Sequence, residues 1–294
     1  MANSSEQFIP ITKAVIPVAG LGTRFLPATR TIPKPLLPIL NVPVIEYAIR
    51  EVVAAGITDV ALVMSPGMEA VSEYFGHQAV LERELRDRGR DELLAEQLEI
   101  AGLANVTVVY QDDPKGPGHA VLQAREFCDE EPFVLVFPDD VIFGPVSATE
   151  QLMQVYREQG GSVIAVLPAD EDDIPKKGIV GGSDPDSNGV MTVSELVEKP
   201  ALEDAPSNLG IVARYVLDSG VFDYLAEERA GAGGEIQITD AIASLLGKSP
   251  IHARQLDGFH ADTGNPQGML DAAVYVESRN NPASAARLKS IIDG

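Results

Sequence analysis

The sequence has a single cysteine, no tryptophan and half as many basic as acidic residues. Cys128 alone cannot form an internal disulfide or a cysteine-based zinc site, and we expect it to fill space at a helix end. The 22 Lys and Arg against 44 Asp and Glu leave a net charge of −22. Such a surface repels DNA, RNA and anionic lipid, so we expect no nucleic-acid partner. An anionic small molecule needs a basic pocket or a metal ion to bind here.

Long hydrophobic runs are also missing. No apolar segment approaches the roughly 18 residues that span a bilayer, and the polar stretch from Met1 to Gln7 has no signal-peptide core. We therefore expect a cytoplasmic protein without a membrane partner. A chain of 294 residues can still bury a large core.

The first half of the chain alternates short apolar runs with helical patterns. The helical patterns lie near Val44–Ala55, Met68–Phe75 and His119–Phe127. This alternation predicts an α/β fold with a largely parallel sheet flanked by helices, whose strands end at one common edge. The strand-like runs are Ala14–Val18, Val60–Val63, Val106–Tyr110 and Phe133–Phe137.

The second half is more mixed, and we expect both halves, about 10–145 and about 146–294, to pack as one domain. Thr239 or Asp240 could cap a helix over Ala241–Leu246, and residues 266–292 look helical with a break at Asn281-Pro282. Residues 78–103 predict an inserted helix or helix pair, on the surface or against a partner subunit. Strand-like runs occur at Ser162–Leu167, Val190–Val197, Leu209–Leu217 and Ile251–Gln255.

A glycine loop, Gly20-Leu21-Gly22, follows the first predicted strand. Glycines let a backbone approach an anion closely, and Arg24, Arg30 and Lys34 add positive charge nearby. A tight turn would explain the glycines but not these cations, so the segment predicts a polyphosphate site. Phe25 replaces the third glycine of a dinucleotide fingerprint, and a Walker A loop is absent, which disfavours an NAD-dependent enzyme.

Four further segments carry candidate chemistry. Asp139 and Asp140 close an apolar strand and Asp262 follows another, so Asp139 and Asp262 could clamp one Mg²⁺; solvated turn residues are the alternative. The amide of Gln111 suits a pyrimidine edge, unless it is a surface residue. Glu198 and Lys199 could bind sugar hydroxyls and a phosphate, or form a solvated pair.

Taken together, the motifs resemble the sugar-1-phosphate nucleotidylyltransferases, and within them the bacterial uridylyltransferases that act on UTP and glucose 1-phosphate. The resemblance runs in order from about residue 13 to 276. Its motifs are the run from Ala19 to Arg24 with Pro33-Lys34, then Lys115–Ala120, Val197–Pro200, Pro206–Leu209, Gly234–Asp240 and Asp262–Asn265.

The resemblance implies a Rossmann-like nucleotidyltransferase fold with a smaller mixed sugar-binding half. It implies a role for each site residue. Arg24, Lys34 and Lys199 are the catalytic cations. The nucleotide contacts Ala19, Gly20, Gly22, Thr23, Gln111 and Gly116, the sugar contacts Gly178, Glu198, Lys199 and Ile211, and Mg²⁺ binds Asp139 and Asp262.

The implied reaction joins UTP and α-D-glucose 1-phosphate into UDP-glucose and pyrophosphate, with Mg²⁺ and without a covalent intermediate. The family also implies a homo-oligomer, a dimer or tetramer. Two alternatives stay open: a thymidylyltransferase, because uracil and thymine share one hydrogen-bonding edge, and a non-catalytic nucleotide-sugar sensor.

Overall fold

Four runs of apolar, β-branched residues form the parallel half of the central sheet. They are β1 (Lys13–Pro17), β4 (Asp59–Met64), β5 (Asn105–Tyr110) and β6 (Phe133–Val136). In the computed structural model, which describes residues 8–293, they lie in the order β5-β4-β1-β6 and all pairs are parallel. The predicted parallel sheet is confirmed, and the segments that follow these strands share one edge.

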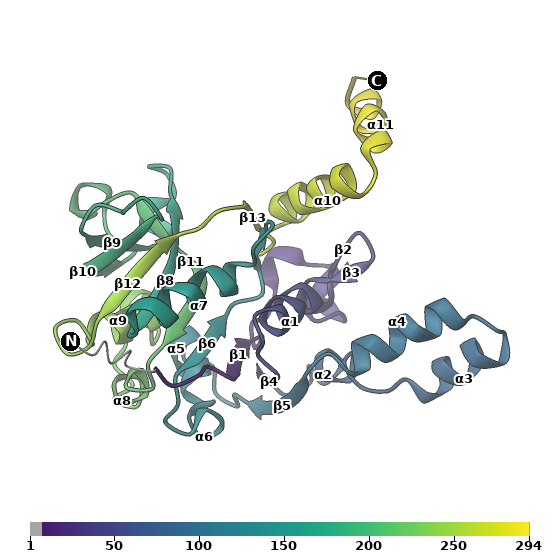
Figure 1. The fold of residues 1–294 in the computed structure, drawn as a ribbon, viewed down its shortest axis with the longest axis horizontal. Helices are drawn as coiled ribbons and strands as arrows, with labels where there is room; N and C mark the ends of the chain where they lie inside the picture. The colour runs from purple at the N-terminus through teal and green to yellow at the C-terminus, as the bar shows by residue number, and fades with distance from the viewer. Residues whose placement is uncertain (1–7, 294) are drawn as a thin grey trace, which may run out of the picture.

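The second half of the chain extends the same sheet to nine strands, in the order β6-β11-β8-β12-β10-β9 (Figure 1). Here β11 runs antiparallel to both β6 and β8, which makes the sheet mixed. Four of the five strands were expected; β9, in which three of five residues are glycine, was not. The bounds are β8 (Ser162–Pro168), β9 (Gly178–Gly182), β10 (Val190–Glu198), β11 (Leu209–Leu217) and β12 (Ile251–Gln255).

Two small strand pairs lie outside this sheet. One joins β7 (Asp140–Phe143) to β13 (Phe259–Asp262) in antiparallel register, with Asp140 opposite Asp262. The other joins β2 (Pro38–Ile39) to β3 (Val42–Pro43). The first pair matters for function, because it brings two acidic segments together that are more than a hundred residues apart in sequence.

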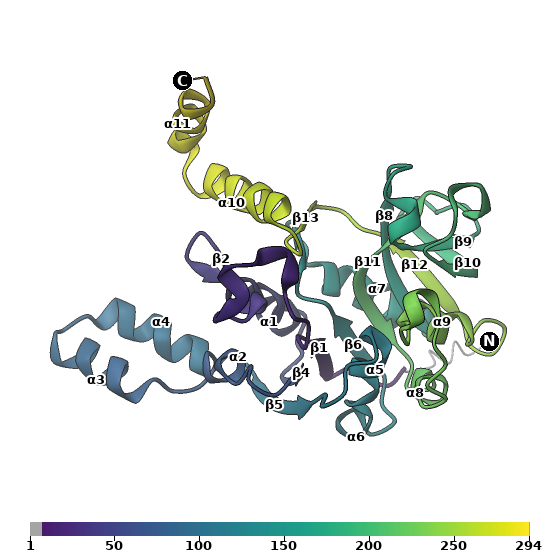
Figure 2. The same ribbon diagram turned by 180° about the vertical axis from the view of Figure 1, so that it is seen from behind.

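Helices cover both faces of the sheet (Figures 1 and 2). On one face lie α1 (Val44–Ala54) and α7 (Ala148–Gln159); on the other lie α5 (Pro117–Leu122), α8 (Val221–Leu225) and α9 (Ile238–Ala243). Short helices α2 (Ala70–Glu73) and α6 (Arg125–Cys128) complete the layers. Central strands bury both faces: Val15 packs in one core, and Ala14 and Ile16 pack in the other.

Two helix predictions were inaccurate. The pattern at 119–127 forms two short helices, α5 and α6, instead of one. Helix α9 starts at Ile238 with Gln237 as its N-cap residue, so Thr239 and Asp240 lie inside the helix and do not cap it. Tertiary packing explains the second error, because Thr239 is buried.

Residues 78–103 form a helix pair, α3 (Ala79–Asp87) and α4 (Asp91–Ala101), which extends away from the rest of the protein (Figure 1). At the other end of the chain, α10 (Pro266–Asn280) and α11 (Pro282–Asp293) are separated at Asn281, as expected. Cys128 is buried at the end of α6. None of the helices described here combines the length and apolar character needed to cross a membrane. The one-domain organisation stays a prediction.

Candidate active site

The glycine loop after β1 forms one wall of a pocket of about 340 Å³. Gly22 has a φ of +62°, and a Cβ atom there would lie 2.9 Å from the Cβ of Lys34. Only glycine therefore lets the loop pack this closely against Lys34. A Cβ on Gly20 would meet nothing within 4 Å, so its backbone faces open space. Of the residues proposed from the sequence, those that line this pocket are Ala19, Gly20, Gly22, Lys34, Gln111, Gly116 and Asp139.

A second glycine segment, Lys115–Gly118, is joined to residues 235–237 by main-chain contacts. Gly118 N donates to Ile236 O at 2.8 Å, and Ile236 N donates to Lys115 O at 2.8 Å. A Cβ on Gly118 would lie 2.7 Å from Ile236 O, and Gly116 has a φ of +114°. The resemblance implied a nucleotide contact for Gly116, which lines the pocket; the structure shows that both glycines also admit the Ile236 main chain.

Two carboxylates and one guanidinium converge next to this pocket. A Cβ atom placed on Gly264 would lie 2.7 Å from Asp262 Oδ1, 3.1 Å from Asp139 Oδ2 and 3.6 Å from Arg24 Nη1. All three groups therefore surround one point that no side chain occupies. Asp139 Oδ2 also accepts a hydrogen bond from Lys34 Nζ at 2.6 Å. Four of the charged residues proposed from the sequence, Arg24, Lys34, Asp139 and Asp262, lie together.

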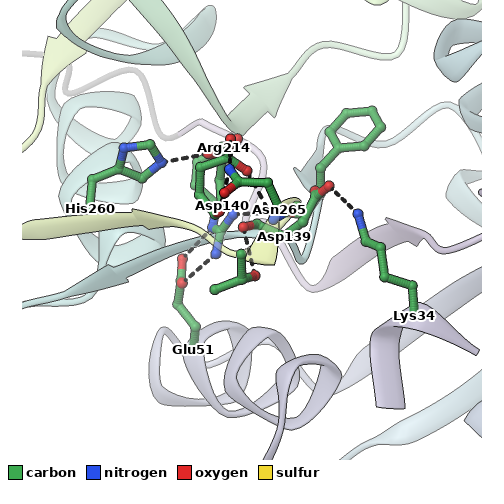
Figure 3. A network of polar contacts seen from close by, with 11 residues as sticks. Lys34, Glu51, Asp139, Asp140, Arg214, His260 and Asn265 are labelled. Carbon is green, nitrogen blue, oxygen red and sulfur yellow. Dashed lines mark hydrogen bonds and ion pairs between the residues drawn. The ribbon is translucent and has the colours of Figure 1, made fainter. Parts of the chain in front are cut away.

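Residues 262–265 hold the two acidic segments in place (Figure 3). Thr263 donates from both its backbone N and its hydroxyl to Asp139 O, at 2.7 and 2.8 Å. Asn265 donates to Asp262 Oδ2 at 2.9 Å, and its own side-chain oxygen caps helix α10 at Gly268 N. Thr263 therefore holds the Asp139 main chain, and Asn265 holds the Asp262 carboxylate and the start of α10.

A buried ion pair supports the segment that carries Asp139 (Figure 3). Arg214 on β11 binds Glu51 on α1 through two hydrogen bonds of 3.0 Å, and its Nη1 donates to Phe137 O at 2.8 Å. Glu51 Oε1 also accepts from the backbone and hydroxyl of Thr149. The pair thereby ties two helices to the main chain just before Asp139.

Asp140 is bound differently from its neighbour. Its Oδ1 lies 2.5 Å from His260 Nε2. Burial raises the pKa of Asp140, but the hydrogen bond with His260 and nearby positive charges, among them Arg214, outweigh burial and hold the pKa below its usual range. Asp140 is therefore an ionised carboxylate held by His260, and Asp139 is the one of the two that lines the pocket beside the glycine loop.

A second pocket, of about 320 Å³, lies on the other side of Asp139. A Cβ on Gly178 would lie 2.9 Å from Ile211 Cδ1, 2.9 Å from Thr239 Oγ1 and 3.0 Å from Glu198 Oε2. Three of the four residues proposed for the sugar, Gly178, Glu198 and Ile211, are therefore neighbours. Lys199, also lining this pocket, has a φ of +49°, a conformation that ordinary residues adopt mainly where the surroundings impose it.

The sequence did not reveal several residues of this site, and one residue that it proposed lies outside both pockets. The exposed Thr23 lines neither pocket. Thr239, whose hydroxyl faces the second pocket, was taken for a helix cap. Arg214 and Glu51 were not singled out, because nothing in a sequence shows that two charges from distant elements are buried together.

Known proteins resemble this chain in sequence over most of its length. The nucleotidyl transferase family model matches residues 13–279. The chain belongs to the nucleotidyl transferase family. It is 42% identical over 266 residues to the UTP–glucose-1-phosphate uridylyltransferase YngB of Bacillus subtilis, covering 90% of this chain and 89% of that protein. A similarly named protein of Staphylococcus saprophyticus is also 42% identical, over 90% and 92%.

Solved nucleotidyl transferase structures agree. A UTP-bound UGPase from Acinetobacter baumannii superposes with a TM-score of 0.87 at 34% identity, over 96% of this chain and 99% of that one. A UDP-glucose pyrophosphorylase in complex with UDP-glucose superposes with a TM-score of 0.82 at 33% identity, over 92% and 100%. The expected nucleotidyltransferase fold is therefore confirmed.

Proposed function

We propose that this nucleotidyl transferase moves a uridylyl group from UTP to α-D-glucose 1-phosphate, releasing pyrophosphate and UDP-glucose. A phosphate oxygen of the sugar phosphate attacks the α-phosphorus of UTP, and the bond to the pyrophosphate oxygen breaks. The relatives that are named for this activity, at 42% identity over 90% of the chain, support the choice of substrates.

One observation carries the proposal: Asp139 borders both pockets. The glycine loop, Lys34 and Gln111 line the first, which suits a nucleotide. Gly178, Glu198 and Lys199 line the second, which suits a sugar phosphate. Two bound anions would therefore meet beside Asp139, Asp262 and Arg24, where Arg24 and a cation held by the two carboxylates would offset their charge.

The carboxylate pair fits Mg²⁺. This ion prefers oxygen ligands and takes one or two protein carboxylates together with phosphate oxygens and water. Asp139 Oδ2 and Asp262 Oδ1 flank one point, next to a guanidinium that would face the phosphates. Among residues 8–293 no group of three or more His, Cys, Asp or Glu gathers as a metal site, which suits an ion that shares its ligands with a substrate. Mg²⁺, when bound, neutralises phosphate charge.

The protein's own residues position the reactants and stabilise charge. Lys34 lines the nucleotide pocket and binds Asp139, Arg24 lies beside the carboxylates, and Lys199 lines the second pocket. Because the attacking phosphate oxygen is already ionised near pH 7, no general base is needed. The rate gain then comes from orientation and fixed positive charge.

Pyrophosphate release with UTP, glucose 1-phosphate and Mg²⁺ tests the proposal. We expect turnover that stops after chelation of Mg²⁺ and returns when it is added back. Galactose 1-phosphate tests the sugar site, and dTTP tests the rival thymidylyltransferase. Turnover of dTTP above that of UTP would favour the rival, and nucleotide binding without turnover would favour a sensor. The cytoplasmic location and the dimer or tetramer stay predictions.

A further inference from the structure

Gln111, the amide that lines the nucleotide pocket, is buried and is bonded to a residue that does not line it. Its Nε2 lies 2.8 Å from Nδ1 of His119, which is also buried on α5. The main chain of Gln111 is fixed separately, because its N donates to Met64 O at 2.8 Å. With the backbone fixed, the amide can change only by rotating about its side-chain bonds, and His119 is the side chain that opposes this rotation.

The other ring nitrogen of His119 faces a second amide. His119 Nε2 lies 3.2 Å from Nε2 of Gln123, one helical turn further along the chain, and the same Gln123 nitrogen lies 3.2 Å from His119 O. A neutral imidazole offers one donor and one acceptor. Both contacts are made by amide nitrogens, so a neutral ring can accept a hydrogen bond from only one of them, either Gln111 Nε2 at Nδ1 or Gln123 Nε2 at Nε2. The orientation of Gln111 is thus coupled to the ring proton and to Gln123.

The orientation of Gln111 decides which base edge it matches. Turning the amide by half a turn exchanges its donor and its acceptor. Uracil offers an N3–H donor beside carbonyl acceptors, whereas cytosine offers an N3 acceptor beside an amino donor. One orientation of a fixed amide therefore accepts uracil and opposes cytosine, and a freely turning amide would discriminate less.

We propose that His119, supported by Gln123, is a positioning residue that fixes the Gln111 amide in the orientation selecting uracil over cytosine. The inference rests on the proposed function, since it concerns how UTP is chosen at that same pocket. His119 contacts no substrate. It acts through Gln111, and its removal should change base selection more than the chemical step.

Four variants test this inference in steady-state assays with UTP and CTP, each at saturating glucose 1-phosphate. His119→Phe keeps the ring but removes both polar contacts, and His119→Asn restores a polar partner near the position of Nδ1. Gln123→Met keeps the contact between Gln111 and His119 and removes both contacts of Gln123, to the ring and to His119 O. Gln154→Met, on the exposed side of α7, is the matched control.

For His119→Phe we expect the KM for UTP to rise about tenfold and the ratio of kcat/KM for UTP over CTP to fall about tenfold, the size of one lost hydrogen bond. The maximal rate and the KM for glucose 1-phosphate should stay within about twofold. His119→Asn should recover part of the UTP-to-CTP ratio. Gln123→Met should lower it in the same direction, and Gln154→Met should leave it unchanged.

A UTP-to-CTP ratio that stays constant in His119→Phe would overturn the inference, as would a loss confined to the maximal rate. If His119→Phe does not fold, an unchanged ratio in Gln123→Met overturns it instead. These outcomes differ from failure of the proposed function, in which the unmodified protein releases no pyrophosphate from UTP and glucose 1-phosphate.

Discussion

The guanidinium of Arg214 and the carboxylate of Glu51 form a two-hydrogen-bond ion pair in the interior of the protein, with side chains only 1% and 8% exposed. A third hydrogen bond from Arg214 reaches Phe137 O, two residues before Asp139. The buried ion pair is therefore hydrogen-bonded to the main chain just before Asp139, the candidate metal ligand.

Removing one member of this pair should destabilise the protein strongly. Arg214→Met leaves Glu51 buried without its partner, which we expect to cost about 3–5 kcal/mol. The double variant Arg214→Met with Glu51→Met should recover part of that loss. Urea unfolding measures both. Arg125→Met breaks the exposed pair with Asp223 and should cost less than about 1 kcal/mol; an equal cost for both arginines would contradict a special role for burial.

Arg24 should matter for turnover more than for binding. Its guanidinium lies beside the two carboxylates, where charge develops during phosphoryl transfer, so Arg24→Ala should lower kcat by roughly 10²–10³. Pyrophosphate release at saturating substrates is the measurement. Arg30→Ala, in the same exposed loop, should stay within about twofold. A near-normal rate for Arg24→Ala would remove it from the site.

Lys199 should matter for the sugar phosphate. A charge-assisted hydrogen bond contributes roughly 1.5–3 kcal/mol, so Lys199→Ala should raise the KM for glucose 1-phosphate about 10- to 100-fold. The KM for UTP should change little. In the control variant Lys248→Ala, the KM for UTP and the KM for glucose 1-phosphate should both change little. A rise in the KM for UTP alone would show that Lys199 binds the nucleotide and not the sugar phosphate.

Gly264 offers a test of the metal site that leaves every ligand in place. Its φ lies outside the left-handed region, so alanine is compatible with the backbone, yet the added methyl would lie 2.7 Å from Asp262 Oδ1. We expect Gly264→Ala to raise the Mg²⁺ concentration for half-maximal activity by about tenfold, because the carboxylates must move apart. Asp139→Asn should abolish activity at ordinary Mg²⁺.

The control for that substitution is Gly102→Ala, where the new methyl makes only an ordinary contact of 3.5 Å. It should leave the Mg²⁺ dependence unchanged. Unaltered Mg²⁺ dependence in Gly264→Ala would argue against a shared ion between Asp139 and Asp262.

His252 should make the fold sensitive to acid. Both of its ring nitrogens are buried without a hydrogen-bond partner in the part of the chain described, and burial lowers the pKa of His252 below its ordinary value. The unfolded chain therefore binds the proton more readily. Stability from this residue is complete above about pH 6.5 and declines below it. Between pH 7 and 5, His252→Leu should show a shallower decline in unfolding free energy; an equal slope would contradict this account.

Local patterns were sufficient for much of the fold. Apolar β-branched runs such as Phe133–Phe137 predicted parallel strands, because strands buried on both faces need continuous hydrophobic residues. The same reasoning missed β9, where three of five residues are glycine, and it failed at Thr239, where a cap was expected. In both places packing against distant elements overrides local preference.

The sequence by itself determined the α/β order, the phosphate-type glycine loop and the identity of the charged residues, because these depend on neighbours along the chain. Only the tertiary structure decided which charges meet. Strand β13 places Asp262 opposite β7, Arg214 finds Glu51, and His119 meets Gln111. Such contacts join residues from separate elements, and their energies depend on burial and distance, which exist only once the chain has folded.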